Sequence, residues 1–187
     1  PYTYDWPDFN ISGDTSVYSP ALMAAGDYTA IITDVNGCTN SITVTMTEPS
    51  AISASITNMI TYGVGGYDIE CHGGSNGNVI VTVIGGVPFP GPNVYTYSWT
   101  DAGGNSYGNA VDATGLSAGT YAVTGTDFNG CPYTATITLT DPDPVDFTFV
   151  ASDYNGYNIA CNPDVNGATL EGIVSGGADG VDMSTYL

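Results

Sequence analysis

Residues 119–142, GTYAVTGTDFNGCPYTATITLTDP, decide the fold of this chain, because residues 26–49 repeat them as GDYTAIITDVNGCTNSITVTMTEP. The two stretches lie 93 residues apart and are identical at 11 of 24 positions. A fixed period of this length is typical of repeated domains that follow one another along a chain. We therefore expect a tandem array.

Each stretch predicts a β-hairpin. Its turn reads Asp-x-Asn-Gly, in which Asn and Gly tolerate a positive φ. The predicted turn residues are Asp34, Asn36 and Gly37 in one copy and Asp127, Asn129 and Gly130 in the other. After the second turn, residues 134–140 alternate between threonine and apolar residues, which is the period of a half-buried strand. Pro49 and Pro142 then end the two hairpins.

Further matches set the expected domain bounds. Residues 2–6 (YTYDW) match residues 95–99 (YTYSW) at the same offset, and in the second copy Tyr95, Tyr97 and Trp99 form a predicted inward aromatic row. Residues 66–71 match residues 156–161 at an offset of 90, and Gly85-Gly86 continues that match as Ser175-Gly176. We predict the C-terminal half of a repeat at 1–49, a complete repeat at 50–142 and the N-terminal half of another at 143–187. The chain is interpreted as a window cut from a longer array.

The complete repeat has the strand count of an immunoglobulin-like β-sandwich, six or seven short strands with a turn signal every 8–12 residues. Tyr28 and Tyr121 follow the same pattern, an apolar residue, two small residues, Gly and any residue. This pattern predicts a tyrosine corner, in which the hydroxyl bonds to backbone upstream. The alternative is a tyrosine packed on a strand face. The predicted fold is all-β.

Four cysteines occupy two positions of the repeat. Cys38 and Cys131 follow the Asp-x-Asn-Gly turn, whereas Cys71 and Cys161 end a Tyr-x-Ile-x-Cys strand. There is no C-x-x-C and only one histidine, so the spacing is not a zinc pattern. We predict a disulfide between Cys71 and Cys131 in an oxidising compartment. The alternative is a pair of buried free thiols.

The charge excludes several functions. The chain has no lysine or arginine and 19 acidic residues, a net charge of −19. Without cations it cannot neutralise phosphate, so nucleic-acid binding is excluded and binding to an anionic membrane surface is disfavoured. No apolar run approaches the ~20 residues of a membrane-spanning helix. Calcium is considered at the repeat boundaries, where Glu48 and then Asp141, Asp143 and Asp146 gather, but prolines separate these acids as in a plain linker. We expect no metal and no cofactor.

Three separated motifs resemble one family. They are GTYAVTGTDFNGC at 119–131, IECHGGSNG at 69–77 and YTYSW at 95–99. In this order they resemble the SprB repeat, and the resemblance covers 50–142 and both flanking halves. It implies a very large repetitive protein of the bacterial cell surface in Bacteroidota, secreted by the type IX system and acting as a gliding adhesin. Gly125 departs from the family, which usually has a β-branched residue there, and the chain diverges from Pro163 onward, so strand register and loop shape are open at these points.

The expected function is structural, an extended extracellular stalk or filament segment whose partners are neighbouring repeats of the same chain. The alternative is a module that binds glycan or another surface, with surface polysaccharide as the partner and Tyr107, Tyr133 and Tyr154 as exposed aromatic contacts. An enzyme is not expected. The carboxylates are not paired, and there is no nucleophile elbow, histidine triad or phosphate loop.

Overall fold

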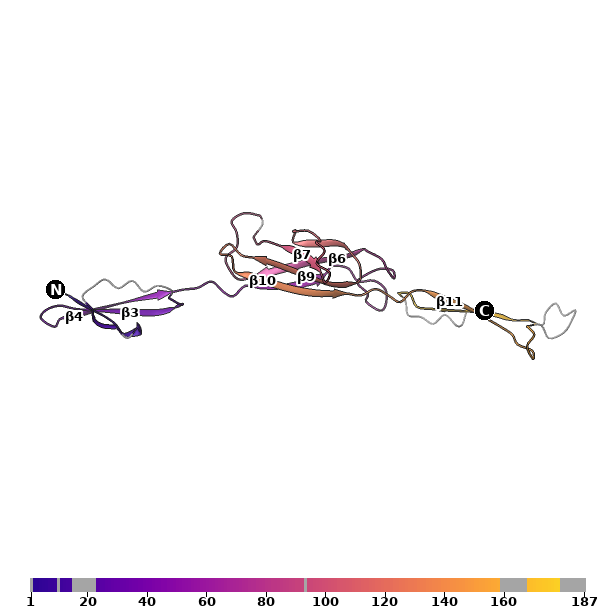
Figure 1. Ribbon diagram of the computed structural model, residues 1–187, viewed down its shortest axis with the longest axis horizontal. Coiled ribbons are helices and arrows are strands. Elements are labelled where there is room, and N and C mark those ends of the chain that lie inside the picture. The colour runs from indigo at the N-terminus through magenta and orange to yellow at the C-terminus, as the bar shows by residue number, and fades with distance from the viewer. Residues whose placement is uncertain (1, 10, 15–22, 93, 159–167, 179–187) are drawn as a thin grey trace. The chain divides into compact units, whose positions relative to one another are not determined.

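The computed structural model describes residues 2–9, 11–14, 23–92, 94–158 and 168–178 (Figure 1). The chain divides into two compact units, Pro1–Ser50 and Ala51–Leu187. Apart from one 3-10 turn, η1 (Pro7–Phe9), the described elements are β-strands, and every strand pairing among them is antiparallel. This confirms the all-β prediction.

The complete repeat is a sandwich of two three-stranded sheets. One has the order β5-β6-β8 and the other β10-β9-β7. The strands are β5 (Ser53–Asn58), β6 (Gly77–Ile84), β7 (Ser98–Asp101), β8 (Asp112–Leu116), β9 (Gly119–Thr126) and β10 (Pro132–Leu139). Taken in chain order as A, B, C, E, F and G, they give sheets A-B-E and C-F-G, which is the immunoglobulin-like arrangement. The described residues have no separate strand between β7 and β8.

Both sheets contribute to one hydrophobic core. In β6 every second residue, Val79 and then Val81, is buried because a strand turns successive side chains to opposite faces. The fully buried Trp99 of β7 lies among them, and its Nε1 donates to the Ala110 carbonyl at 2.9 Å. The core residues are Ile69, Val79, Val81, Trp99, Ala113, Leu116, Tyr121, Val123 and Leu139.

This core does without the disulfide of antibody domains. There, a tryptophan on strand C packs against a cystine whose second half lies two residues after the corner tyrosine. Here that position is Val123, which is fully buried two residues after Tyr121. Apolar packing therefore fills the place of the intersheet disulfide.

Residues 1–50 contain one described sheet, with the order β2-β1-β3-β4. Its strands are β1 (Thr3–Trp6), β2 (Ile11–Asp14), β3 (Gly26–Thr33) and β4 (Thr39–Met46). The β3–β4 hairpin has the register of β9–β10, since Gly26 pairs with Met46 as Gly119 pairs with Leu139. The repeat seen in the sequence is thus also a repeat of strand pairing.

The last part of the chain forms a hairpin of β11 (Asp146–Ala151) and β12 (Leu170–Ser175), the counterparts of β5 and β6. Asp146 pairs with Ser175 where Ser53 pairs with Ile84, so β12 follows β6 by 91 residues. The sequence match of Gly85-Gly86 with Ser175-Gly176 is therefore wrong by one residue. Gly176 and Gly177 are the counterparts, and all four glycines of the two pairs have a φ between 64° and 80°, a region that favours glycine.

Candidate functional site

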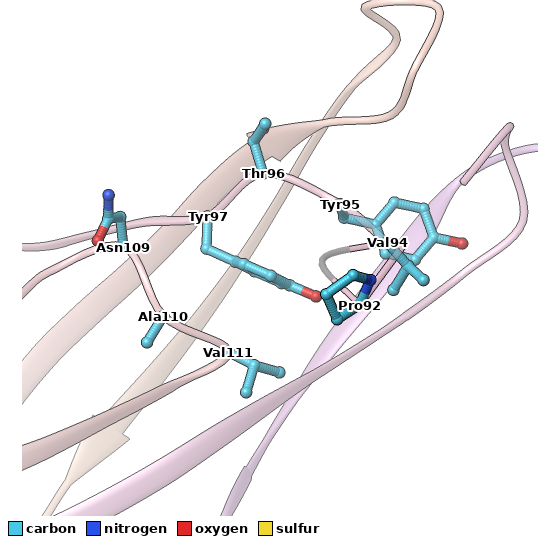
Figure 2. Close-up of a pocket in the computed structure, with 8 residues that line it drawn as sticks. All are labelled: Pro92, Val94, Tyr95, Thr96, Tyr97, Asn109, Ala110 and Val111. Atoms are coloured by element: carbon cyan, nitrogen blue, oxygen red, sulfur yellow. The ribbon is translucent and has the colours of Figure 1, made fainter. Parts of the chain in front are cut away.

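A hollow of about 530 Å³ lies beside the start of β7 in the complete repeat (Figure 2). Two segments line it. Pro92 and residues 94–97 lead into β7, and residues 109–111 lead into β8. We refer to it as the Tyr97 pocket, because the ring of Tyr97 lies across it with the hydroxyl pointing toward Pro92 (Figure 2).

Hydrogen bonds to neighbouring backbone hold the aromatic side of the pocket in place. Tyr95 donates its hydroxyl to the Gly85 carbonyl at 2.8 Å. Thr96 donates both its backbone N–H and its hydroxyl to the Thr126 carbonyl at the end of β9. Residues 95 and 96 are therefore fixed, and Thr96 lies beside the end of β9. This fixes the wall of the pocket from which Tyr97 projects.

The pocket is uncharged. None of its lining residues is ionised at neutral pH, and burial, followed by the neighbouring Tyr95, raises the pKa of Tyr97. Within the described part of the chain the Tyr97 hydroxyl has no hydrogen-bond partner. A neutral phenol, the exposed amide of Asn109 and the Pro92 ring can contact a neutral polar ligand, but they offer no acid–base pair for catalysis.

The acidic turn residue Asp127 is buried, with 1% of its surface exposed. One carboxylate oxygen accepts the backbone N–H groups of Asn129 and Cys131 at 2.9 and 2.8 Å, and the other accepts that of Val87 at 2.8 Å. These bonds, first that from Val87, lower the pKa of Asp127 despite its burial. Asp127 therefore ties the β9–β10 turn to the end of β6.

The same turn appears in two other places. Asp34 accepts the N–H groups of Asn36 and Cys38 at 2.9 and 2.8 Å. Asp101 accepts those of Gly103 and Asn105 in the loop after β7, and the sequence prediction missed this third turn. Its signal is the sequence Asp-Ala-Gly-Gly-Asn at 101–105, where a short acidic side chain can bond to backbone two residues on.

Both corner tyrosines bond to backbone four residues upstream. Tyr28 donates to the Ala24 carbonyl and Tyr121 to the Ser117 carbonyl, each at 3.0 Å. Tyr121 is buried at the start of β9, the place of the tyrosine corner in immunoglobulin-like domains.

The structure does not contain the expected disulfide between Cys71 and Cys131. Cys38, Cys71 and Cys131 are free and exposed, and Cys161 lies outside the described residues. Cys131 directly precedes β10, whereas Cys71 lies near its other end, where the N–H of Ile69 bonds to the Thr140 carbonyl. Eight residues of strand span ~26 Å, while a disulfide needs Cα atoms within ~7 Å. The prediction is corrected because the two cysteines lie at opposite ends of the sandwich, and they are not buried thiols either.

Two of the three tyrosines proposed as exposed contacts belong to the packed interior. Tyr133 is only 6% exposed. Tyr107 packs edge-on against Tyr121, with ring centroids 5.1 Å apart, and donates its hydroxyl to Asp101. Only Tyr154, at 43% exposure, is open to solvent. In the predicted inward aromatic row, Tyr95 and Tyr97 are half-buried and Trp99 is buried, while Val94, Thr96 and Ser98 between them are exposed.

At the end of the complete repeat, Asp141 accepts the Gly73 N–H at 2.7 Å and lies 3.2 Å from Nδ1 of His72. Within the described ranges, no group of three or more His, Cys, Asp or Glu side chains could hold a metal ion. No helix among the described residues is long and apolar enough to cross a membrane.

Comparison with known proteins identifies no family. No family model matches the chain, and no curated protein matches it. Among solved structures, the chain is similar to the N-terminal eight Ig domains of Down Syndrome Cell Adhesion Molecule (DSCAM) isoform 1.30.30, with 15% identity and a TM-score of 0.31. The match covers 92% of this chain and 28% of that one. A TM-score this low adds nothing to the strand order described above.

Proposed function

We propose that this chain is a structural segment of a large secreted protein of the bacterial cell surface, in which repeated sandwiches form an extended stalk for adhesion. One observation carries the proposal: the chain enters and leaves the complete repeat at opposite ends. It enters at Ser53, opposite Ile84, beside the turn that Asp127 holds. It leaves at Thr140, beside Ile69 at the other end of β10. A repeat with this path can be followed by another without folding back on itself.

The first and last strands of the repeat also support a load-bearing role. β5 and β10 run in the same direction and lie in contact with each other. Tension applied at the two ends would therefore shear these strands past each other and load their contacts together. The absence of lysine and arginine, with a net charge of −19, suits neighbouring surfaces that must stay apart in water. Secretion by the type IX system and a role in gliding rest on the sequence resemblance alone.

The test of the stalk is the length of the molecule in solution. Chains of residues 1–187 are lengthened by inserting one, two or four further copies of 50–142 and measured by small-angle X-ray scattering. A stalk predicts a maximum dimension that grows by a constant increment, ~35–45 Å per copy, from the strand length and the end loops. A radius of gyration that grows only as the ~0.38 power of length would mean that the repeats collapse together, and would contradict the proposal.

A second function, binding of a neutral glycan, is favoured by the Tyr97 pocket. Its aromatic ring, its neutral phenol and the Asn109 amide suit the apolar faces and hydroxyl groups of a sugar. With no cation in the chain, an anionic polysaccharide would be repelled.

The test uses neutral and acidic glycans on an array, with Tyr97→Ala as the pocket variant and Tyr157→Ala, at an exposed tyrosine outside the pocket, as a matched control. We expect binding of neutral glycans that Tyr97→Ala loses and Tyr157→Ala keeps, while the fluorescence of Trp99 reports an intact fold. Equal binding by both variants, or preference for acidic glycans, would contradict the site.

A further inference from the structure

The complete repeat carries one exposed thiol at each of its two ends. Cys131 lies at the end where the chain enters, in the turn that Asp127 holds. Cys71 lies at the end where the chain leaves, two residues after Ile69, whose N–H bonds to the Thr140 carbonyl. The eight residues of β10, ~26 Å of strand, separate these ends. Neither thiol can therefore reach the other within one repeat.

The loop that carries Cys71 is bonded to the linker that leads into the next repeat. The Gly73 N–H donates to the Asp141 carboxylate at 2.7 Å, and Nδ1 of His72 lies 3.0 Å from the Pro142 carbonyl oxygen. The linker is short, since β11 begins seven residues after β10 ends. β5 likewise begins seven residues after β4 ends, so both linkers of the chain have the same length. Cys71 is therefore held at the junction between two repeats.

Cys71 and the first residues of the next repeat line one hollow of about 400 Å³. The next repeat contributes Val145, just before β11, and Gly177 and Ala178, just after β12. The loop after β5 comes equally close, since an added Cβ on Gly63 would lie 2.6 Å from the Ala178 carbonyl oxygen. The end at which the chain leaves the complete repeat therefore lies against the end at which it enters the next.

The complete repeat shows where a turn cysteine lies relative to the position of Ala178. β12 follows β6 by 91 residues, so Ala178 is the counterpart of Val87. Val87 donates its N–H to one oxygen of Asp127 at 2.8 Å, and the other oxygen accepts the N–H of Cys131 at 2.8 Å. In a tandem array, the Asp-x-Asn-Gly-Cys turn of the next repeat would bond to Ala178 in the same way. That turn brings its cysteine to the junction that Cys71 lines.

We propose that a disulfide joins successive repeats, from the cysteine at the Cys71 position of one repeat to the cysteine at the Cys131 position of the next. This inference rests on the proposed tandem array. The two thiols lose two protons and two electrons to the oxidant, a small-molecule or protein disulfide, which is reduced to two thiols. An extracellular surface is a compartment in which such bonds form and persist.

The bond gives the stalk a second covalent path. Along the backbone, one turn cysteine lies 93 residues from the next, as Cys38 does from Cys131. The second path runs from Cys131 back to Cys71 and across the disulfide, and it is only 60 residues long. A repeat that unfolds under tension can then lengthen the stalk by no more than the shorter path allows.

The experiment uses residues 1–187 with one further copy of 50–142 inserted after Pro142, equilibrated with oxidised and reduced glutathione. We expect the lengthened chain to become two hydrogens lighter, with a peptic peptide pair that joins Cys71 of the first copy to Cys131 of the second. The 187-residue chain should form no internal disulfide, because it contains only one cysteine of each junction.

Variants of single copies locate the bond. Cys71→Ser in the first copy and Cys131→Ser in the second should each abolish it. The same substitutions in the opposite copies, Cys131→Ser in the first and Cys71→Ser in the second, are the matched controls and should leave it intact. All four changes are at exposed positions, so the fold is kept.

Two results would overturn the proposal. One is a lengthened chain whose six cysteines, four from residues 1–187 and two from the added copy, all react with maleimide after oxidation. The other is a bond that a control variant abolishes, since it would then lie within one copy. The stalk is tested separately, because scattering from the same chain in reductant gives the increment per copy whether or not the bond forms. A constant increment without the bond would remove the disulfide and leave the stalk.

Discussion

Gly125 and Tyr133 show how one residue sets the choice of another. They pair directly across β9 and β10, and the Tyr133 hydroxyl donates to the Thr96 carbonyl. A Cβ on Gly125 would lie 1.9 Å from that carbonyl oxygen and 2.6 Å from the Tyr133 hydroxyl. In residues 1–50 the same paired positions hold Ile32 and Asn40. The Thr96 carbonyl, and after it the Tyr133 hydroxyl that bonds to it, therefore leave no room for a β-branched residue at Gly125. The β9–β10 register is unbroken over its eight pairs.

This coupling predicts the outcome of a double-mutant cycle. Gly125→Ile should destabilise the complete repeat by ~1–3 kcal/mol through overpacking, and Tyr133→Asn by a similar amount through a lost contact. The double variant copies the pair of residues 1–50, so its loss should be smaller than the sum by ~1–3 kcal/mol. Urea unfolding followed by Trp99 fluorescence, with Trp6→Phe as background, measures all three. Strictly additive losses would show that the two positions are independent.

Tyr133 also makes stability depend on pH. Burial, and then the neighbouring Tyr97 and Tyr95, raise its pKa to about 12 from the ordinary 10.0. The unfolded chain thus gives up this proton more readily than the folded one, and stability present below pH ~10 is lost as the pH rises toward 12. Tyr133→Phe should start less stable but lose stability less steeply over this range. Urea unfolding at successive pH values gives both slopes, and equal slopes would assign the titration to other tyrosines.

At the scale of elements, the ends of the strands decide what the cysteines can do. Cys71 and Cys131 lie at opposite ends of β10, so we expect both, and Cys38 as well, to react with a maleimide in the native protein without reductant. Cys71→Ser and Cys131→Ser should each change the free energy of unfolding by less than ~0.5 kcal/mol. A disulfide that closed the 60 residues between them would be worth ~4 kcal/mol in chain-entropy models. A native mass two hydrogens lighter, or a loss near that size, would restore the disulfide.

The same elements show how much of the fold and of the candidate site could be predicted from the sequence. The Asp-x-Asn-Gly turns and the strand after Cys131 could be predicted because local backbone chemistry and a period of two fix them. The predicted Cys71–Cys131 disulfide is wrong because cysteine spacing does not show at which end of a sandwich each residue lies. The burial of Tyr107 and Tyr133 could not be predicted, because their hydroxyls bond to partners 6 and 37 residues away, and only the packed sheets create these contacts. The Tyr97 pocket was not predicted because two loops distant in sequence form it.

At the scale of the whole molecule, the acidic net charge opposes folding. Nineteen acidic residues face no lysine or arginine, so the chain holds its shape by apolar packing and backbone hydrogen bonds against its own repulsion. Several acids reduce that cost by accepting backbone N–H groups, as Asp127 and Asp101 do. Their pKa values are lowered accordingly, in both cases by hydrogen bonds. In these turns the acidic side chains accept hydrogen bonds from the backbone.

This charge predicts a melting temperature that rises with monovalent salt. Screening weakens the repulsion among acids, and ~1 kcal/mol gained corresponds to ~4–8 °C for a domain of 60–100 residues.

Calcium should add no more to the melting temperature than magnesium does at equal ionic strength. Asp141 already accepts the Gly73 N–H and lies beside His72, and Asp146 accepts the N–H of Phe147, so these acids do not converge on one point. Scanning calorimetry of residues 1–187 in sodium, magnesium and calcium chloride, with Asp141→Asn as the control, measures the difference. A filled calcium site would add ~2.7 kcal/mol to the free energy of unfolding at a hundredfold excess over its Kd. A stabilisation of that size that Asp141→Asn removes would establish a calcium site at this boundary.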